Sequence, residues 1–221
     1  IRFECIKAKK VAFSIQKKSD YQAQGVKQTE KGIEFSVRSQ KFFIKTFSSS
    51  NVYNVLCAII IGQLFKISMK EIKKSIVCMN SLKQRQNFYR TKKKFWMIDD
   101  TYNANPISVK AAIESLSCFP GKGRRIFVFG NMNELGLKSK SAHESVGRQV
   151  ARSNIDYFVT VGEKAKISAD ALNSKTVKKE SFFSCQSASK FLNAFIQPND
   201  VILIKGSRGS HMEEIVQEIE Q

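Results

Sequence analysis

The sequence has no apolar stretch long enough to cross a membrane as a helix. Its longest apolar run, residues 55–64, is interrupted by Gly62 and Gln63, whereas a spanning helix needs about 20 apolar residues. The first residues contain neither an initiator methionine nor an apolar signal-peptide core. We therefore expect a cytoplasmic protein without a membrane partner, and a chain that begins inside a longer protein.

Cysteine spacing typical of a metal site or a redox motif is also missing. The five cysteines are far apart, and most of them lie in apolar patterns (Cys5, Cys57, Cys78, Cys118 and Cys185). Pairs that bind zinc or exchange disulfides are closely spaced. We interpret all five as reduced packing residues of a cytosolic protein, and we expect no metal site in this chain.

Acidic residues are scarce in the first part of the chain. Residues 1–97 hold 21 Lys and Arg against 5 Asp and Glu, whereas residues 98–221 hold 16 against 14. A basic region can attract nucleic acid, an anionic membrane surface or an anionic small substrate, or it can simply be a solvated surface. The lysine pairs come without aromatic platforms or a recognised nucleic-acid module. A nucleic-acid partner is therefore not expected.

Hydrophobic periodicity predicts different structures before and after residue 94. Apolar alternation at residues 11–15, 33–37 and 42–45 predicts a small antiparallel meander, and 3–4 spacing at residues 51–64 and 69–79 predicts two helices. Further on, strand patterns at 95–98, 125–129, 157–161, 181–185 and 201–205 are each followed by a helical pattern. This alternation favours an α/β protein whose second part has a mostly parallel sheet with helices on both faces.

Polar residues crowd the end of the first of these later strands. Residues 98–106 read Ile-Asp-Asp-Thr-Tyr-Asn-Ala-Asn-Pro, and open α/β sheets bind ligands at such strand ends. Asn105 and Pro106 suit the start of a helix, as its cap and its first residue. Capping does not explain the two aspartates, Tyr102 or Asn103, which are costly to crowd together unless something polar binds there.

Four segments together resemble the Mur ligase family, in the branch that joins D-alanyl-D-alanine to UDP-N-acetylmuramoyl-tripeptide. They are Asn-Val-Tyr-Asn at 51–54, Asp-Asp-Thr-Tyr-Asn-Ala-Asn-Pro at 99–106, Phe-Gly-Asn-Met-Asn-Glu-Leu-Gly at 129–136 and Lys-Gly-Ser-Arg at 205–208. The resemblance implies that residues 1–94 are the rear portion of the central ATP-binding domain and that residues 95–221 are the C-terminal domain, which is Rossmann-like.

The same resemblance implies a cytoplasmic, monomeric enzyme of peptidoglycan precursor synthesis. ATP would phosphorylate a carboxylate of the tripeptide substrate, and the amine of D-alanyl-D-alanine would attack the resulting acyl phosphate. The sequence contains no Gly-x-x-Gly-Lys-Thr phosphate loop. The ligands of Mg²⁺ are likewise expected upstream of Ile1, so this piece is expected to be inactive alone.

The resemblance assigns site residues for two ligands, and none of them as a catalytic residue. An amide can donate to and accept from a base edge, a guanidinium suits phosphate, a carboxylate can accept from ribose hydroxyls, and a cation at a strand end can hold a carboxylate. The nucleotide-binding set is Asn51, Asn54, Arg85 and Asp100. The substrate-binding set is Tyr102, Asn103, Asn105, Lys205, Ser207 and Arg208.

Structural alternatives exist for several of these residues. Asn51 and Asn54 could cap a helix that begins near Val52, Asn105 could be a plain cap, and Arg85 could be a surface residue. The family pattern is also broken in three places: Ser48–Ser50 replace Gly-x-His, Gln84 replaces the glycine before the arginine, and Asn131 replaces an aspartate. The competing hypothesis is a non-catalytic basic α/β binding module that touches nucleic acid.

Overall fold

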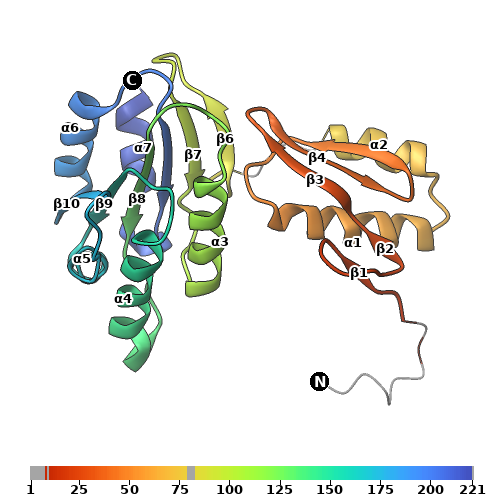
Figure 1. Cartoon of the computed structure of the whole chain (residues 1–221), viewed down its shortest axis with the longest axis horizontal. Helices are drawn as coiled ribbons and strands as arrows, with labels where there is room; N and C mark the ends of the chain where they lie inside the picture. Colours follow the sequence, from red (N-terminus) through yellow and green to blue (C-terminus); the bar gives the residue numbers. More distant parts are fainter. Residues whose placement is uncertain (1–7, 9, 79–82, 221) are drawn as a thin grey trace.

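The chain folds into two regions that lie side by side (Figure 1). The structure is a computed structural model, and it describes residue 8, residues 10–78 and residues 83–220. The first region holds strands β1–β5 with helices α1 and α2, and the second holds strands β6–β11 with helices α3–α7. Among the described residues, no helix combines the length and the apolar content that a bilayer crossing requires.

The first region is a small sheet backed by two helices. Its elements are β1 (Phe13–Ser14), β2 (Tyr21–Gln22), β3 (Gln24–Thr29), β4 (Gly32–Val37), β5 (Gln40–Ile44), α1 (Ser50–Leu64) and α2 (Met69–Val77). The three strands β3, β4 and β5 pair antiparallel in that order. Alternate residues of β4 point inward (Ile33, Phe35 and Val37) and share one core with the buried face of α1. The period-2 pattern therefore buries one face of this sheet.

The meander is confirmed, but one of its strands was assigned wrongly. Residues 11–15 contribute only the two-residue β1, which pairs parallel with β2 outside the meander. The third meander strand is β3, in a segment that looked like a turn because it contains Gly25. That strand lies mostly exposed at a sheet edge, and its register shifts between Gln24 and Lys27, so it shows no apolar alternation. The end of the second predicted helix, at Met79, lies outside the described residues.

The second region is built on a six-stranded sheet in the order β10-β9-β8-β11-β7-β6. The strands are β6 (Asn87–Arg90), β7 (Trp96–Asp100), β8 (Arg125–Gly130), β9 (Tyr157–Val161), β10 (Lys178–Phe182) and β11 (Val201–Lys205). All neighbouring pairs are parallel except β6 and β7. Because β11, the last strand in the chain, inserts between β7 and β8, the strand order reverses there. Such a switch point is where open α/β sheets bind ligands.

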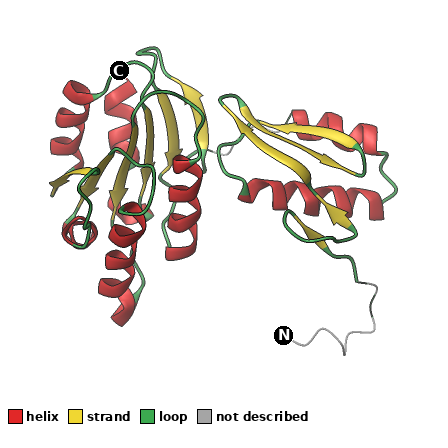
Figure 2. Cartoon of the chain, viewed as in Figure 1, coloured by secondary structure: helices red, strands yellow, loops and turns green. Residues whose placement is uncertain are grey.

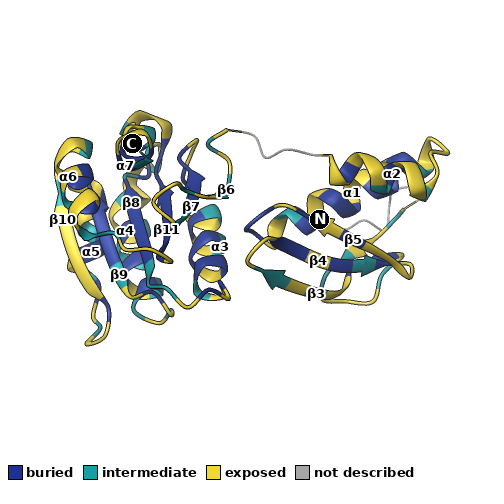
Figure 3. Cartoon of the chain, turned by 90° about the horizontal axis from the view of Figure 1, so that it is seen from above, coloured by how far each residue is buried: buried dark blue, intermediate teal, exposed yellow. Residues whose placement is uncertain are grey.

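Helices cover both faces of this sheet (Figure 2), as expected. Helices α3 (Pro106–Ser117), α4 (Ser139–Val150) and α5 (Glu163–Asp170) pack on one face, and α6 (Cys185–Phe195) and α7 (Glu213–Glu220) pack on the other. The central strands are buried along their whole length (Figure 3), which explains their continuous apolar sequences.

Two strand predictions in this region need correction. The strand expected at 181–185 is β10 at 178–182, because Ser184 caps α6 by accepting from the backbone N–H of Ser187. The exposed residues of β10 gave no apolar signal, and the apolar Phe183 outside it is 74% exposed. Strand β6 was not predicted. It belongs to the second sheet although it precedes residue 95, and the boundary at 94/95 stays a prediction.

The cysteines are less buried than expected. Cys57, Cys78 and Cys118 are exposed and Cys185 is half-buried, all as free thiols, whereas Cys5 lies outside the described residues. Cys57 lies on the exposed side of α1, and Cys78 and Cys118 are the C-cap residues of α2 and α3. The packing role predicted for these three is therefore wrong, because a position within an apolar run does not fix which face of a helix it occupies.

Phe47 joins the two regions. It follows β5 in the first region, yet it is 2% exposed and belongs to the core beneath α3 in the second. Its ring centroid lies 6.1 Å from that of Phe88 and 6.2 Å from that of Phe119. Phe88 in turn stacks on Trp96 at 4.9 Å. One aromatic cluster thus spans the junction.

Candidate functional site

A cavity of about 510 Å³ lies at the junction of the two regions. Residues from β5, from α1 and from the segment before β6 line one side, and residues from the ends of β7 and β11 and from the start of α3 line the other. Eight of the ten expected site residues line this cavity (Asn51, Asn54, Arg85, Asp100, Tyr102, Asn103, Asn105 and Lys205). Its volume is in the range of small-molecule sites.

A buried ion pair lies in the wall of the cavity. Asp100 and Lys205 are the last residues of β7 and β11 and are register partners, so their side chains emerge side by side on one face of the sheet. The Lys205 ammonium donates to Asp100 Oδ2 at 2.6 Å and to the carbonyl oxygen of Asn103 at 2.8 Å. Lys205 is 2% exposed and Asp100 is 7% exposed. Lys205 therefore neutralises Asp100 and holds the loop that follows β7.

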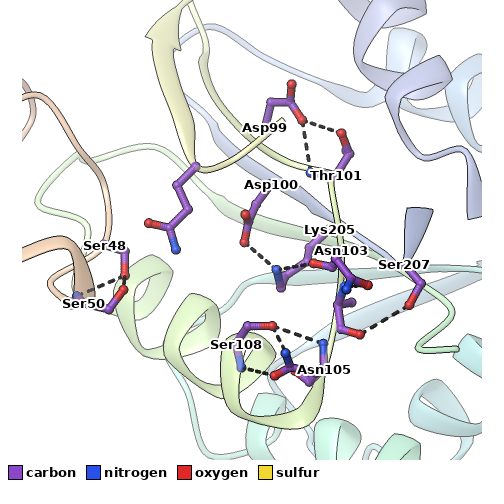
Figure 4. A network of polar contacts seen from close by, with 12 residues as sticks. Ser48, Ser50, Asp99, Asp100, Thr101, Asn103, Asn105, Ser108, Lys205 and Ser207 are labelled. Carbon is purple, nitrogen blue, oxygen red and sulfur yellow. Dashed lines mark hydrogen bonds and ion pairs between the residues drawn. The ribbon is translucent and has the colours of Figure 1, made fainter. Parts of the chain in front are cut away.

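The side chains of the two neighbouring aspartates, Asp99 and Asp100, lie on opposite faces of the sheet. Asp99 points away from Asp100 (Figure 4) and accepts from the Thr101 hydroxyl at 2.7 Å. Burial raises the pKa of the Asp100 carboxyl, against the opposing effect of the Lys205 ammonium. Burial also raises the pKa of Asp99, opposed by the hydrogen bonds from Thr101. Of the two, Asp100 alone lines the cavity.

Residues 84–86 lie along the polypeptide that follows β7. The β6–β7 register pairs Asn87 with Asp99, and the same antiparallel direction brings the Gln84 carbonyl to the backbone N–H of Tyr102 at 2.9 Å. The backbone of Gln86 hydrogen-bonds the Asp100 carboxylate. Gln84 and Gln86 both adopt left-handed conformations, with φ of 62° and 52°, which cost non-glycine residues energy. A strained segment therefore holds Arg85 at the cavity.

Two guanidinium groups flank the ring of Tyr102. The guanidinium carbon of Arg85 lies 4.0 Å from the ring centroid, and that of Arg208 lies 5.8 Å from it. Cation–π attraction favours both placements. Arg85 is exposed, and its stacking on Tyr102 places its cation at the cavity, so its nucleotide role stays a prediction. Arg208 lies next to the cavity without lining it.

The two asparagines of α1 form a chain of amides. Asn54 Nδ2 donates to Asn51 Oδ1 at 3.1 Å, and Asn51 Nδ2 donates to Gln86 Oε1 at 3.0 Å and to Thr46 Oγ1. Neither asparagine caps the helix, because α1 begins at Ser50 with Ser49 as its cap. The capping alternative is therefore wrong for both, and their side chains are directed to the cavity instead.

Asn103 and Asn105 shape the loop between β7 and α3. Asn105 Oδ1 accepts from the backbone N–H of Ser108 at 2.9 Å, while Ser108 Oγ accepts from the Asn105 backbone N–H at 3.1 Å. This reciprocal capping box, with Pro106 as the first helical residue, confirms the capping alternative for Asn105. Asn103 Oδ1 accepts from the backbone N–H of Ala104. Both side chains line the cavity, and their ligand role stays a prediction.

Ser207 lies outside the cavity lining. Its hydroxyl accepts from the backbone N–H of Asn133 at 2.8 Å and donates to the Ala104 carbonyl at 3.3 Å. It thereby ties together the loops after β7, β8 and β11, and Figure 4 shows Ser207 beside the loop after β7. The contacts seen are structural, and the ligand role expected of Ser207 stays a prediction.

The loop after β8 is held from within the protein. Asn131 Oδ1 accepts from the backbone N–H of Ala165 at the start of α5. His143 is buried, with Nε2 accepting from the Met132 backbone N–H at 3.1 Å and Nδ1 lying 2.7 Å from the Ser139 carbonyl. Burial lowers the pKa of His143. These contacts favour structural roles for both residues.

Seven further residues line the cavity without having been predicted: the polar residues Lys45, Thr46, Gln86 and Ser108, and the apolar residues Ile44, Val55 and Ile76. Gln86 is the most informative of them, because its side chain contacts Asn51 and its backbone contacts Asp100. Only the antiparallel pairing of β6 with β7 brings it there, and no pattern in the sequence indicates that pairing. Among the described residues, no group of three or more His, Cys, Asp or Glu side chains could hold a metal ion.

Comparison with known proteins identifies the family of this chain. A family model described as Mur ligase, glutamate ligase domain matches residues 84–208. The chain belongs to the Mur ligase family. The UDP-N-acetylmuramoyl-tripeptide–D-alanyl-D-alanine ligase of Bacillus subtilis is 32% identical over 213 residues, which are 91% of this chain and 45% of that protein. The ligase of the same description from Escherichia coli is 27% identical over 209 residues, which are 92% of this chain and 45% of that protein.

Solved Mur ligases share the arrangement of both regions. The crystal structure of MurF from Acinetobacter baumannii superposes with a TM-score of 0.82 at 27% identity, over 95% of this chain and 46% of that chain. MurF from Thermotoga maritima in complex with ADP gives a TM-score of 0.78 at 23% identity, over 95% of this chain and 48% of that chain, which shows likeness of fold. The expected family and fold are thus confirmed. The chain spans about half the length of the curated Mur ligases it matches.

Proposed function

We propose that this chain forms part of an ATP-dependent ligase that joins D-alanyl-D-alanine to UDP-N-acetylmuramoyl-tripeptide in the cytoplasm. In this proposal it supplies the nucleoside-binding wall of the active site. The observation that carries the proposal is the cavity itself, which gathers Asn54, Arg85, Asp100 and Lys205 from four separate segments. The relatives at 32% and 27% identity are ligases of this reaction.

The cavity offers groups that suit a nucleoside. Asp100 Oδ2 is held by Lys205, so the other carboxylate oxygen can accept a ribose hydroxyl. The amide of Asn54 can donate to and accept from the edge of adenine. Arg85, placed by its stacking on Tyr102, presents donors to phosphate oxygens. ATP supplies the phosphoryl group that activates the carboxylate of the tripeptide substrate, and the residues of this chain bind and orient the nucleotide.

The dipeptide would approach the same cavity from the side of β11. Arg208 lies beside Tyr102, where its guanidinium can hold the terminal carboxylate of D-alanyl-D-alanine. Asn103 and Asn105 line the wall next to it. Ser207 would act by holding the Arg208 loop against the loops after β7 and β8. Lys205 would act on the dipeptide through the loop carbonyl that it binds.

No Mg²⁺ ligand is assigned in the described part of this chain. Mg²⁺ is usually held by one or two carboxylates together with substrate phosphates, and the described residues contain no group of three or more His, Cys, Asp or Glu side chains that could hold a metal ion. No step is therefore assigned to the metal here, and the expectation that its ligands lie upstream of Ile1 stays a prediction.

Nucleotide binding by the 221-residue chain tests the proposal. Asp100→Asn is the variant of choice, because its amide oxygen can still accept from the buried Lys205 ammonium. By isothermal titration calorimetry, we expect ATP affinity to fall about tenfold or more in this variant, from the loss of a charge-assisted hydrogen bond. Equal ATP affinity in the two proteins would contradict the nucleotide site. Salt-sensitive binding to unrelated polynucleotides without ATP binding would favour the basic binding module.

The reaction itself is tested with the longest reading frame that contains this chain. We expect ADP release that requires both D-alanyl-D-alanine and UDP-N-acetylmuramoyl-tripeptide, and that is abolished by Arg208→Ala at subsaturating dipeptide. ADP release that another amino acid supports equally well would overturn the substrate assignment while leaving the nucleotide site intact.

A further inference from the structure

Gln86 connects the two halves of the proposed nucleoside site. It lies in the strained segment before β6, lines the cavity and is half-buried. Its side-chain oxygen accepts from Asn51 in the first region, and its backbone hydrogen-bonds Asp100 in the second. One residue therefore contacts both Asn51, an amide expected at the base, and Asp100, the carboxylate expected at the ribose.

The contact with Asn51 also fixes the direction of two amide groups. Asn51 Nδ2 donates to both Gln86 Oε1 and Thr46 Oγ1, so two acceptors hold the same nitrogen. Asn51 Oδ1 then faces Asn54, which donates to it at 3.1 Å. An isolated amide can exchange its donor and acceptor by rotating about its last bond. In this chain, each amide fixes the orientation of the next.

We propose that Gln86 is a positioning residue that determines base specificity by preventing Asn54 from flipping. With its orientation fixed, Asn54 presents a single arrangement of donor and acceptor to the base. This arrangement can pair with adenine but not with a base whose donor and acceptor positions are exchanged. This inference rests on the proposed function, because it assigns a discriminating role to the same nucleoside site. It also explains why a residue at a strained backbone position carries a long polar side chain.

The test compares adenosine with inosine, in which an acceptor replaces the adenine amino group. Neither ligand carries phosphate, so binding reports on the base and the ribose alone. We expect the chain to prefer adenosine about tenfold, as one well-placed bidentate contact gives. In Gln86→Ala we expect adenosine to bind more weakly and the preference to approach one, because Asn51 and Asn54 can then rotate together.

Two further variants separate positioning from stability. Gln86→Glu keeps an acceptor oxygen for Asn51 and should retain the adenosine preference. Gln63→Ala removes another glutamine whose side chain makes a hydrogen bond, to the Ile67 carbonyl at 2.7 Å, but which does not line the cavity. It should leave the preference unchanged even if the melting temperature falls.

Each outcome decides something. Failure of the unaltered chain to bind adenosine would overturn the nucleoside site, and with it this inference. Binding of adenosine with the same preference in Gln86→Ala as in the unaltered chain would overturn the role of Gln86 while leaving the nucleoside site in place. Loss of the preference in Gln86→Glu as well would show that the acceptor oxygen does not matter, and would also overturn it.

Discussion

The two regions differ most in what they bring to the cavity. Residues 1–97 carry most of the positive charge of the chain, yet the residues of the first region that line the cavity are amide, hydroxyl and apolar groups with Lys45 as the basic exception, and Arg85 follows in the segment before β6. Residues 98–221 are nearly neutral in sum, yet they contribute the buried pair of Asp100 and Lys205. The net charge of a region thus reflects its solvated surface residues. The charged side chains that reach the cavity, in contrast, are those at the ends of paired strands.

The regions also differ in how they are built. In the first, neighbouring strands and helices along the chain pack around one core. In the second, β7 and β11 pair although they are about a hundred residues apart, and cores lie on both faces of the sheet. We expect the first region to depend on local contacts, and the second to be the cooperative unit that holds the site.

The largest expected effect comes from cutting the aromatic link between them. Phe47→Ala removes a buried ring from the cluster with Phe88 and Phe119, and such a deletion costs about 4 kcal/mol. Trp96, the only tryptophan, stacks on Phe88 and reports on this cluster. We expect the midpoint of urea denaturation, measured by Trp96 fluorescence, to move to a much lower urea concentration.

Phe35→Ala is the matched control. Phe35 is equally buried but lies in the first core, stacked on Phe42 at 5.6 Å. It should shift the unfolding measured by far-UV circular dichroism and change the Trp96 transition much less. If both variants move the Trp96 transition equally, the two regions unfold as one unit and the contrast drawn between them is wrong.

The second effect concerns the ion pair of the second region. Lys205→Met leaves the Asp100 carboxylate buried without its cation, which costs about 3 kcal/mol in the free energy of unfolding at neutral pH. Because burial already raises the pKa of Asp100, the loss of Lys205 raises it further. The folded state of the variant then binds a proton more tightly than the unfolded chain. Its stability should therefore improve as the pH falls toward the ordinary carboxyl pKa.

Lys205→Met/Asp100→Asn is the control for this interpretation. Removing both charges should recover most of the stability lost in Lys205→Met at pH 7, as measured by urea denaturation. A double variant as unstable as the single one would mean that the Lys205 contact with the Asn103 carbonyl, rather than the ion pair, stabilises this part of the sheet.

The sequence predicted the lining of the cavity better than it predicted the sheet edges. Both Asp99 and Asp100 were singled out because consecutive polar residues follow a buried apolar strand, a pattern that places them at a strand end, and the family resemblance then selected Asp100. Strands β3 and β10 were missed or misplaced because they are exposed edge strands, whose residues need no apolar alternation. Edge strands are defined by a partner, which a single sequence does not display.

The contacts among site residues were less predictable than their identity. Lys205 was expected to bind a substrate, but its ammonium group already donates to its register partner Asp100. Gln86 was not considered, because its position depends on the pairing of β6 with β7. Asn51 resembled a helix cap because nothing in the sequence showed that α1 begins at Ser50. Pairings between distant strands thus determine which polar residues meet.

A smaller effect is expected in the loop after β8, from the protonation of His143. Burial lowers its pKa below the ordinary value of 6.5, so the unfolded chain binds the proton more readily than the folded one. The stabilising contribution is complete above about pH 6.5 and is lost as the pH falls through the lowered folded pKa. Protonation of Nε2 also ends its acceptance from Met132, a contact that contributes about 1 kcal/mol.

His143→Gln tests this assignment. The variant should lose most of the decrease in stability between pH 7 and pH 5 that the unaltered chain shows in urea denaturation. His211, the other histidine, is exposed, and His211→Gln should leave that decrease in place. If His211→Gln removes the decrease and His143→Gln does not, the acid sensitivity comes from the exposed His211 and not from the buried His143.

The smallest effect lies in the segment that joins the two regions. Gln84 has φ of 62°, and it stands where the Mur ligase pattern has glycine before the arginine. The structure shows a backbone reason for that glycine, because glycine adopts the left-handed conformation without steric cost. Gln84→Gly relieves about 1 kcal/mol of strain, partly offset by the greater entropy that glycine gives the unfolded chain. We expect the melting temperature to rise by about 1–2 °C.

Gln86→Gly relieves similar strain at φ of 52° but also removes the hydrogen bond to Asn51, so its melting temperature should rise less. If Gln84→Gly lowers the melting temperature, the side chain of Gln84 stabilises the junction through contacts that outweigh its backbone strain.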